Sequence, residues 1–477
     1  MSSAECSTPR VVVIGGGLAG MAAAVALESA GILVTLIEAR RVLGGRAGSF
    51  QEPQSGEILD NCQHVLLGCC TNLIDFYRRI SSLDLIRFER TIRFAAPDGR
   101  QWGLTGVRGL PAPLHLGPAM ARFSLLSLRE RLELMGAMLA ILRISAEEFS
   151  DLADVSFGQW LDEHGQSPEL VRKLYDPIVV SGLNEETRSS AASHAIKIFR
   201  DSLLVNRGGY LFGLPTAPLS CLYERLALRD MRLSTRLAEI CFDGGRAQAV
   251  RLQDQTTIPC DAMVLATNFH TVRDWIPPEL LAADSRFNSL DSLQSVPILG
   301  AHLWFDGPVL ATSHLALVEG PLQWLFRKDE TACAVHGVIS AARDWVGVPR
   351  EKCLELFEKQ ICALLPKSEK RKLVRGVMVI EKRATFSPVP GVERLRPRQV
   401  PPPGGIGNLF LAGDYTQTQW PATMEGAVRS GYLAADGVLK LLHVDHPGYC
   451  VADLPLEWPA RSMRHFSMGR TTSRAER

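Results

Sequence analysis

The feature that most constrains the fold is a short apolar run followed by closely spaced glycines near the start of the chain. Residues 11–14, Val-Val-Val-Ile, are typical of a fully buried parallel strand. Gly15, Gly17 and Gly20 follow with G-x-G-x-x-G spacing, and the third glycine opens an alanine-rich stretch that favours a helix. The first glycine permits a tight turn, the second lets the backbone approach a pyrophosphate, and the third permits close helix–strand packing.

A second apolar run and an acid complete this unit. Residues 32–37 predict a second strand, and Glu38 stands at its end. This acid lies at about the 20-residue offset at which a carboxylate binds a ribose hydroxyl in dinucleotide-binding folds. Free N–H groups and the positive dipole at the helix start favour phosphate. These features predict an adenine dinucleotide site, and an empty βαβ unit is the alternative.

Composition sets the class of protein. The 477 residues are 46% hydrophobic and 22% charged, which is typical of a globular protein of two or three domains. A net charge of +1 gives no global field that would attract nucleic acid. The eleven cysteines lack framework spacing and favour reduced thiols. The polar start predicts no signal peptide, and no run reaches the ~20 apolar residues of a membrane span. We therefore expect a cytoplasmic protein.

Residues 41–47, Arg-Val-Leu-Gly-Gly-Arg-Ala, carry two adjacent glycines and an arginine. The glycines permit close backbone approach, and Arg46 offers a permanently charged fork to phosphate oxygens. The segment resembles the L-G-G-R segment of flavoproteins of the amine oxidase and phytoene desaturase superfamily. There it lies along the pyrophosphate and the flavin edge of FAD. The resemblance implies FAD as the cofactor.

A second group of candidate cofactor-binding residues lies near the end of the chain. Residues 408–414 predict a strand that ends on Gly413 and Asp414, and residues 420–427 lead into a helix. The resemblance implies that Asp414 binds a ribityl hydroxyl. It also implies that backbone N–H groups of residues 423–425 face the N1/O2 edge of the flavin, where a helix dipole stabilises the reduced form.

Two motifs narrow the resemblance. Residues 60–68, Asp-Asn-Cys-Gln-His-Val-Leu-Leu-Gly, and residues 413–431 are similar to the squalene-associated FAD-dependent desaturases, whose characterised activity is hydroxysqualene dehydroxylase. Cys62 and Tyr415 stand where that group usually has glycine and often tryptophan. The resemblance implies contacts to FAD from Gly15, Gly17, Leu18, Ala19, Gly20, Glu38, Ala39, Arg40, Gly45, Arg46, Ala47, Gln63, His64, Leu237, Ala266, Thr267, Gly413, Asp414, Pro421, Thr423, Met424, Glu425 and Ala427.

The predicted fold class is α/β + α. We expect a discontinuous Rossmann-like FAD-binding domain, a mixed-sheet substrate domain and a helical insertion. The predicted segments are 1–90, 206–275 and 401–445 for the FAD-binding domain, 91–205 (with the insertion) and 276–400 for the substrate domain, and 446–477 for a polar, mobile tail.

Two motifs that the sequence lacks indicate which type of reaction accompanies the dinucleotide site. No second glycine motif follows a strand, so we expect an external electron donor rather than an NADPH domain. The lack of an Asp-Asp-x-x-Asp cluster argues against ionisation of a prenyl diphosphate at a metal, and no metal site is predicted. The resemblance implies a long apolar isoprenoid substrate and hydride transfer from reduced FAD to hydroxysqualene.

A departing hydroxyl needs a proton. His64 is the candidate acid, with Asp60 expected to orient it, and a structural or FAD-contacting role for His64 is the alternative. Three alternative functions stay open: a carotenoid-type desaturase, an amine oxidase, and a non-enzymatic prenyl-lipid-binding protein.

An apolar stripe gives a further hypothesis. Leu128, Leu132 and Met135 continue at helical spacing to Leu142, with arginines on both sides. The stripe predicts either an ordinary helix packed on its core or an element that dips into a membrane surface. Peripheral contact with the cytoplasmic membrane face is therefore a second expectation.

Overall fold

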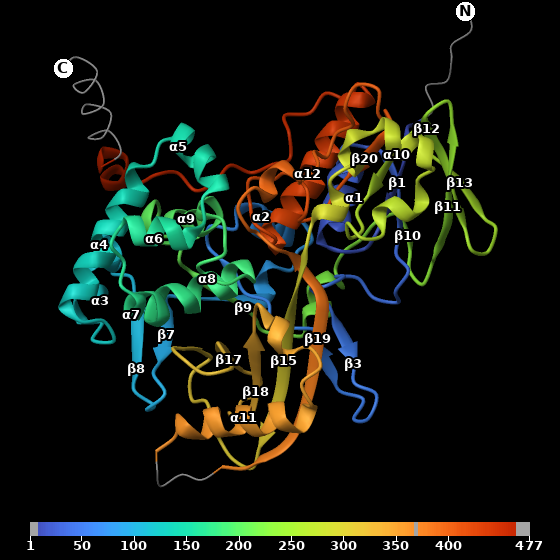
Figure 1. The fold of residues 1–477 in the computed structure, drawn as a ribbon. Helices are drawn as coiled ribbons and strands as arrows, with labels where there is room; N and C mark the ends of the chain where they lie inside the picture. The colour runs from blue at the N-terminus through green and yellow to red at the C-terminus, as the bar shows by residue number, and fades with distance from the viewer. Residues whose placement is uncertain (1–7, 367–370, 464–477) are drawn as a thin grey trace, which may run out of the picture.

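The computed structural model describes residues 8–366 and 371–463, and a five-stranded parallel sheet organises its cofactor-binding half (Figure 1). The strand order is β10-β2-β1-β14-β20, and each neighbouring pair is parallel. The sheet therefore joins five segments that are far apart in the sequence: β1 (Arg10–Ile14), β2 (Leu33–Ile37), β10 (Asp230–Arg232), β14 (Ala262–Leu265) and β20 (Leu409–Leu411).

Alternate residues of these strands point to opposite sides of the sheet. Both faces are covered by other elements. Val11 and Val13 pack with α1 (Leu18–Ser29) and α12 (Met424–Leu441) on one face. Val12 and Ile14 pack on the other, toward the three-stranded sheet β11 (Leu237–Asp243), β12 (Arg246–Leu252) and β13 (Thr257–Pro259). The buried parallel strand predicted from the sequence is confirmed.

A seven-stranded mixed sheet lies below in Figure 1, with α11 (Arg350–Ala363) packed on one face. Its order is β19-β15-β18-β17-β16-β7-β8. The β7–β8 hairpin, which turns around residues 97–99, supplies two strands at one edge. The strands are β7 (Thr91–Ala95), β8 (Gln101–Thr105), β15 (Ser295–Phe305), β16 (His314–Leu317), β17 (Trp324–Arg327), β18 (Ala334–Ile339) and β19 (Leu373–Phe386).

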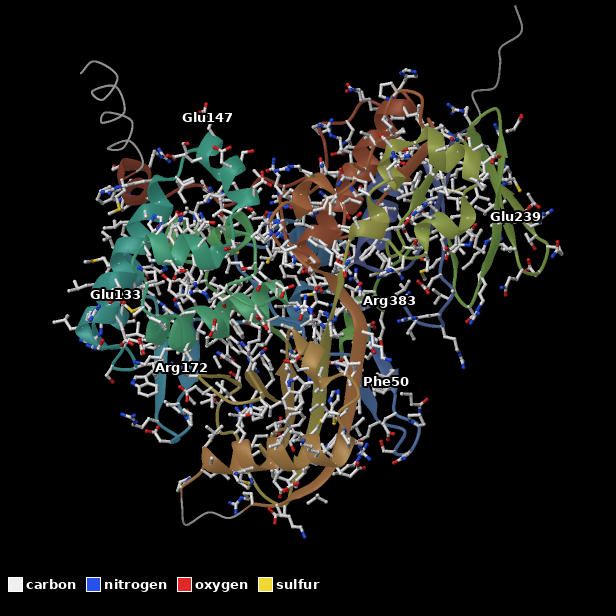
Figure 2. The ribbon with its side chains drawn as sticks, viewed as in Figure 1. Phe50, Glu133, Glu147, Arg172, Glu239 and Arg383 are labelled. Carbon is white, nitrogen blue, oxygen red and sulfur yellow. The ribbon has the colours of Figure 1, made fainter. Side chains whose placement is uncertain are left out.

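Helices between β8 and β9 form a separate layer at the left of Figure 1. Ser127 and Ser145 begin helices with complete capping boxes, whereas the Ser156 side chain caps its helix alone, by accepting from the Gln159 N–H. Side chains fill the interior, and charged ones such as Glu147 and Arg172 lie outside (Figure 2). The helices are α3 (Gly117–Arg122), α4 (Leu128–Arg143), α5 (Ala146–Asp151), α6 (Phe157–Glu163), α7 (Pro168–Leu170), α8 (Asp176–Leu183) and α9 (Ala192–Phe199).

Smaller elements connect these layers. They are β3 (Ser49–Gln51), β4 (Ile58–Asp60), β5 (Leu66–Leu67), α2 (Thr71–Arg79), β6 (Ile86–Glu89), β9 (Phe212–Pro215) and α10 (Pro278–Ala283). The mixed α/β fold class is confirmed. The domain boundaries given above remain predictions.

Two local features differ from what the sequence suggests. Residues 219–228 have the apolar pattern of a helix, but they form only a short 3-10 turn, Leu219–Tyr223, in which the N–H groups of Leu219 and Ser220 bond to side chains of the β3–β4 hairpin. The tail expected to be mobile packs down as far as residue 463: the Tyr449 hydroxyl lies 2.6 Å from that of Ser29, and Ala460 is fully buried. Residues 464–477 lie outside the described residues.

Close packing of α12 on α1 requires a glycine, which gives the first testable prediction. A Cβ atom on Gly431 would lie 2.2 Å from the Ala19 carbonyl oxygen. Gly431→Ala is therefore expected to lower the free energy of unfolding by about 1–3 kcal/mol, as overpacking does. The matched control is Gly136→Ala in α4, where the new Cβ meets nothing within 4 Å. That variant should gain about 0.5–1 kcal/mol from helix propensity. Urea unfolding measures both, and equal effects would contradict the packing argument.

Candidate functional site

The glycine turn after β1 has a backbone shape that fits a phosphate ligand. Gly15 has φ +112°, and a Cβ atom there would lie 2.5 Å from the Ala266 carbonyl oxygen. A Cβ on Gly20 would lie 1.9 Å from the Gly15 oxygen, so both positions require glycine for packing. Gly17 differs, because its Cβ would meet nothing within 4 Å. The turn therefore packs closely against the protein at Gly15 and Gly20, and it leaves free space beside Gly17.

The start of α1 fits an anion for a second reason. Gly17 is its N-cap residue, no side chain caps this end, and its first turn holds no acidic residue. The first N–H groups of a helix have no intrahelical acceptor, so they and the helix dipole favour a phosphate at this place. Leu18 and Ala19, expected to contact the cofactor, supply two of these N–H groups.

Glu38 and the 44–47 segment lie against the same turn. The Glu38 carboxylate accepts hydrogen bonds from the N–H groups of Gly16 and Arg40, each over 2.7 Å. The Gly44 N–H donates to the Gly16 carbonyl over 2.9 Å, and a Cβ on Gly45 would lie 3.2 Å from the Gly17 Cα. The two glycine motifs predicted to bind one dinucleotide are therefore in contact.

The C-terminal motif meets these segments through an ion pair. The Arg46 guanidinium lies 2.5 Å from the Asp414 carboxylate and donates to the Ala384 carbonyl oxygen of β19. Burial would lower the pKa of Arg46, but the Asp414 carboxylate outweighs it and raises that pKa above its ordinary value. Arg46 thus joins the start of the chain, the end of β20 and the second sheet at one point.

Two buried hydroxyl groups near this point have no partner among the described residues. They are that of Thr267, whose Cγ2 lies 3.6 Å from where a Cβ atom of Gly15 would stand, and that of Tyr415, next to Asp414 in the chain. Buried polar groups are normally hydrogen-bonded, so unpaired ones mark places where a bound molecule supplies the partner. Together with the open second glycine, they fit a polar cofactor bound along this edge.

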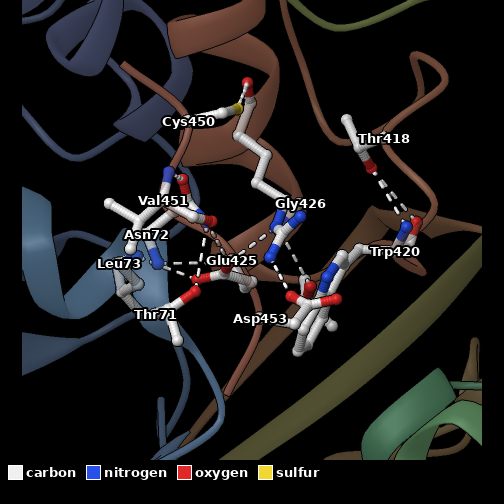
Figure 3. A network of polar contacts seen from close by, with 12 residues as sticks. Thr71, Asn72, Leu73, Thr418, Trp420, Glu425, Gly426, Cys450, Val451 and Asp453 are labelled. Carbon is white, nitrogen blue, oxygen red and sulfur yellow. Dashed lines mark hydrogen bonds and ion pairs between the residues drawn. The ribbon is translucent and has the colours of Figure 1, made fainter. Parts of the chain in front are cut away.

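Glu425 has a different role from the one its position in the sequence suggests (Figure 3). Its carboxylate is fully buried and accepts from the backbone N–H groups of Asn72 and Leu73, over 3.2 and 2.8 Å, and from Arg429 over 2.8 Å. It therefore caps α2 rather than facing the glycine turn. Thr423 caps α12 by accepting from the Gly426 N–H over 3.1 Å. Cofactor contacts from the backbone at residues 423–425 remain a prediction.

The expected pairing of Asp60 with His64 is wrong. The His64 Nδ1 donates to the Cys62 carbonyl oxygen over 3.0 Å, while the Asp60 carboxylate accepts from Ser49, the Leu219 N–H and Lys328 over 2.8, 2.9 and 3.0 Å. Burial would raise the pKa of Asp60, but the Lys328 ammonium and these hydrogen bonds hold it below its ordinary value. Burial lowers the pKa of His64. Their catalytic roles remain a proposal.

Other residues of this cluster carry no sequence motif. Lys328, just after β17, donates to both Asp60 and Gln63, each over 3.0 Å. His302 of β15 donates from Nε2 to the Asp60 carbonyl oxygen over 2.9 Å. His302 and His336 are paired residues of β15 and β18, with ring centroids 4.1 Å apart. Only the pairing of the strands, which the sequence does not reveal, brings these side chains to residues 60–64.

The remaining candidate residues line the same region. Ala266 continues the edge of β14, and its N–H donates to the Ile14 carbonyl over 2.8 Å. Ala47 accepts from the Tyr223 hydroxyl over 2.9 Å. Leu237 begins β11, two residues after Thr235, whose N–H donates to the Glu38 carbonyl. Ala39, Pro421, Met424 and Ala427 lie in the segments already described.

Comparison with known proteins places this arrangement among flavoproteins. The family of flavin containing amine oxidoreductases matches residues 18–439. Hydroxysqualene dehydroxylase of Rhodopseudomonas palustris is 30% identical over 90% of this chain and 98% of its own length. The 15-cis-phytoene desaturase of Synechococcus elongatus is 26% identical over 90% and 96%. The solved structure of an oxidoreductase from Methanosarcina mazei shares the fold at 16% identity, with a TM-score of 0.67 over 90% of this chain and 100% of that one.

The open second glycine gives a prediction that separates cofactor binding from folding. Gly17→Ala introduces a methyl group that the protein itself accommodates, but the methyl would stand where a pyrophosphate approaches. The variant should keep the unfolding midpoint of the apoprotein while its FAD affinity falls by about tenfold or more, equivalent to about 1.4 kcal/mol. Gly20→Ala is the contrasting control and should lose stability. Fluorescence titration with FAD and thermal unfolding measure the two effects; unchanged FAD affinity in Gly17→Ala would overturn the assignment.

Proposed function

Because this chain belongs to the family of flavin containing amine oxidoreductases and is an FAD-dependent oxidoreductase, we propose that it reduces hydroxysqualene to squalene. The observation that carries this choice is the 30% identity to a hydroxysqualene dehydroxylase along 98% of that protein. FAD, when bound and reduced by an external donor, supplies the hydride: a C–O bond breaks, a C–H bond forms, and the hydroxyl leaves as water after taking a proton.

The residues around Arg46 would hold the cofactor in this reaction. The α1 N-terminus and Gly17 would face the pyrophosphate, Glu38 the ribose, and Asp414 the ribityl chain. Arg46 already pairs with Asp414, so its guanidinium is held in place before the cofactor binds. These contacts follow the family resemblance and the geometry of the glycine turns.

His64 is the proposed proton donor for the leaving hydroxyl, with constraints that its contacts impose. Its Nδ1 hydrogen is directed to the Cys62 carbonyl, so only Nε2 is available to a substrate. Donation from Nε2 needs the doubly protonated ring, which burial opposes and the Asp60 charge favours. Asp60, fixed by Lys328 and Ser49, would thus act through its field rather than through a hydrogen bond to His64.

The reaction can be tested directly. Anaerobic incubation of the FAD-loaded protein with excess reduced FAD and hydroxysqualene should yield squalene, detected by mass spectrometry, and oxidised FAD alone should yield none. His64→Gln should slow turnover by about a hundredfold or more, because general acid catalysis contributes about 10²–10⁴. His164→Gln is the matched control, since His164 Nδ1 also bonds to a backbone carbonyl, that of Trp160, over 2.8 Å. Failure of the wild type to form squalene would refute the proposal.

A carotenoid-type desaturase is the second candidate, because the phytoene desaturases of several organisms match at 25–26% identity over most of this chain. The same site would then run in reverse, with oxidised FAD accepting hydride from a polyene precursor. The two functions differ in the flavin state they consume. Conversion of phytoene with oxidised FAD, without conversion of hydroxysqualene, would favour this second function.

We also propose that one face of α4 contacts a membrane surface. Leu128, Leu132 and Met135 lie along one side of the helix and are 71%, 55% and 54% exposed. The buried face carries Leu134 and Ile141 instead. The hypothesis that the whole stripe packs on the core is therefore wrong for these three residues. No helix of the described residues has the length and apolar character to cross a bilayer.

The surroundings of α4 favour a lipid surface. Arg122 and Phe123, beside α4, help to line a surface pocket of about 400 Å³ together with Trp102 and Val107 of the β8 region. Arg122 is exposed and would meet anionic headgroups, while Arg129, also exposed, is paired with Glu133. The three apolar side chains would enter the acyl boundary. An isoprenoid substrate would be delivered from such a surface.

Vesicle flotation tests this contact. Replacing Leu128, Leu132 and Met135 by serine should abolish binding to vesicles with anionic lipid while leaving the unfolding midpoint nearly unchanged, because the three side chains are exposed. Val374→Ser is the control, since Val374 is 69% exposed on β19, at the opposite edge of the seven-stranded sheet from β8. Undiminished flotation of the triple variant would refute the contact.

A further inference from the structure

A row of histidines crosses the seven-stranded sheet. His314 of β16 is paired with Phe326 of β17, Phe326 with His336 of β18, and His336 with His302 of β15. Paired residues of adjacent strands share a face, so these four side chains lie on one side of the sheet. Their sequence neighbours Leu325, Val335 and Leu303 pack toward α11 on the other side. The histidine row therefore faces away from α11.

His336 is the member of this row that lacks a partner at both ring nitrogens within the described part of the chain, whereas His314 lacks one at Nε2 alone. Its side chain is 0% exposed, and neither ring nitrogen has a hydrogen-bond partner among the described residues. His302, next to it, donates to the Asp60 carbonyl, and His314 contacts Ser313 at 3.1 Å through Nδ1. A buried polar side chain that stays unpaired disfavours the folded state, so an unpaired one needs a reason.

The position of the His336 ring gives that reason. Its Nε2 lies 2.7 Å from where a Cβ atom of Gly300 would stand, so the ring occupies space that only a glycine on β15 leaves free. The same point on Gly300 lies 3.3 Å from the Asn61 carbonyl oxygen. The ring is therefore held at the residues 60–64 turn, beside the segment that carries Arg46.

Apart from this turn, the His302 ring and the nearby Lys328, the surroundings of His336 are apolar. Cys62, Trp324, Phe326 and Val338 are buried in one hydrophobic cluster, which continues to the helices above the sheet. Burial lowers the pKa of His336 well below its ordinary value, and the neighbouring His302, Lys328 and His64 lower it further. The ring is thus neutral near pH 7, with one N–H donor and one lone pair.

We propose that His336 is the polar end of the substrate site and binds the hydroxyl group of an isoprenoid alcohol. This inference rests on the proposed function and names the group that the site recognises. A hydroxyl can donate to the lone pair or accept from the N–H of a neutral imidazole, so it can pair with one of the two free nitrogens. A pure hydrocarbon such as squalene would leave both nitrogens unpaired, and a diphosphate would find no cation here, since Lys328 is already paired with Asp60. His336 therefore selects the alcohol before reduction and releases the hydrocarbon after it.

Ligand affinity tests the proposal without turnover. The FAD-loaded protein is titrated with hydroxysqualene and with squalene in detergent micelles, and binding is followed by the change in flavin absorbance. His336→Phe and His336→Leu remove both nitrogens, and each should weaken hydroxysqualene binding by about tenfold, the loss expected for one unpaired hydrogen bond, while squalene binding changes by less than about twofold. His336→Gln keeps a donor and an acceptor and should restore most of the affinity for the alcohol.

The control is His314→Phe, the same substitution in the same row, at a ring that already contacts Ser313 and stacks on Phe212 with centroids 4.5 Å apart. It should leave the ratio of the two affinities unchanged. Equal loss of both ligands in the His336 variants, or no loss of either, would overturn the inference. Squalene formation by the wild type is measured separately. If the wild type forms squalene but the His336 variants keep the wild-type ratio of the two affinities, this inference alone is refuted. If the His336 variants lose affinity for the alcohol alone but the wild type forms no squalene, the proposed reaction alone is refuted.

Discussion

The parallel pairing of β1 with β14 and of β14 with β20 is the constraint on which the site depends. In a parallel sheet the strands end at the same edge, so the loops after all three strands must lie together. Those loops carry the glycine turn, Thr267 and Asp414, although hundreds of residues separate them. Arg46 then fixes this edge to the second sheet through Asp414 and the Ala384 carbonyl. The site exists because three strands share one direction.

The charged side chains that lie in the apolar interior are paired with donors or acceptors. Asp60, Glu425 and Arg396 are almost completely buried, and each is surrounded by donors or acceptors that satisfy it. Such pairing offsets the cost of removing a charge from water. His336 departs from this pattern, as do the Thr267 and Tyr415 hydroxyls. Other atoms unpaired within the described residues, those of His115 and Ser193 among them, lie in the helical layer between β8 and β9. The charged groups that have partners hold the framework around the site.

The sequence predicts best what one continuous stretch encodes. Strand, turn, helix and acid of residues 11–38 could be placed because glycine spacing and apolar runs act locally. His302 and His336 could not be found, since their contact depends on the register between β15 and β18. In α4, apolar residues occupy more than one side of the helix, so periodicity alone did not show that Leu134 and Ile141, rather than Leu128 and Leu132, are buried. The segment after Asp445 is polar in composition, yet Tyr449 and Ala460 anchor it in ways that composition does not reveal.

The capping of α2 by Glu425 has a consequence for how the protein is made. The helix near the start of the chain receives its N-terminal acceptor from a residue near the end, and β20 closes the same sheet. A ribosome releases residues in order, and N-terminal parts generally fold first. Here the early β1–α1–β2 unit must wait for β20 and α12 before its nucleotide-binding edge is complete. The edge that carries the glycine turn, Thr267 and Asp414 therefore forms only after nearly the whole polypeptide has been translated.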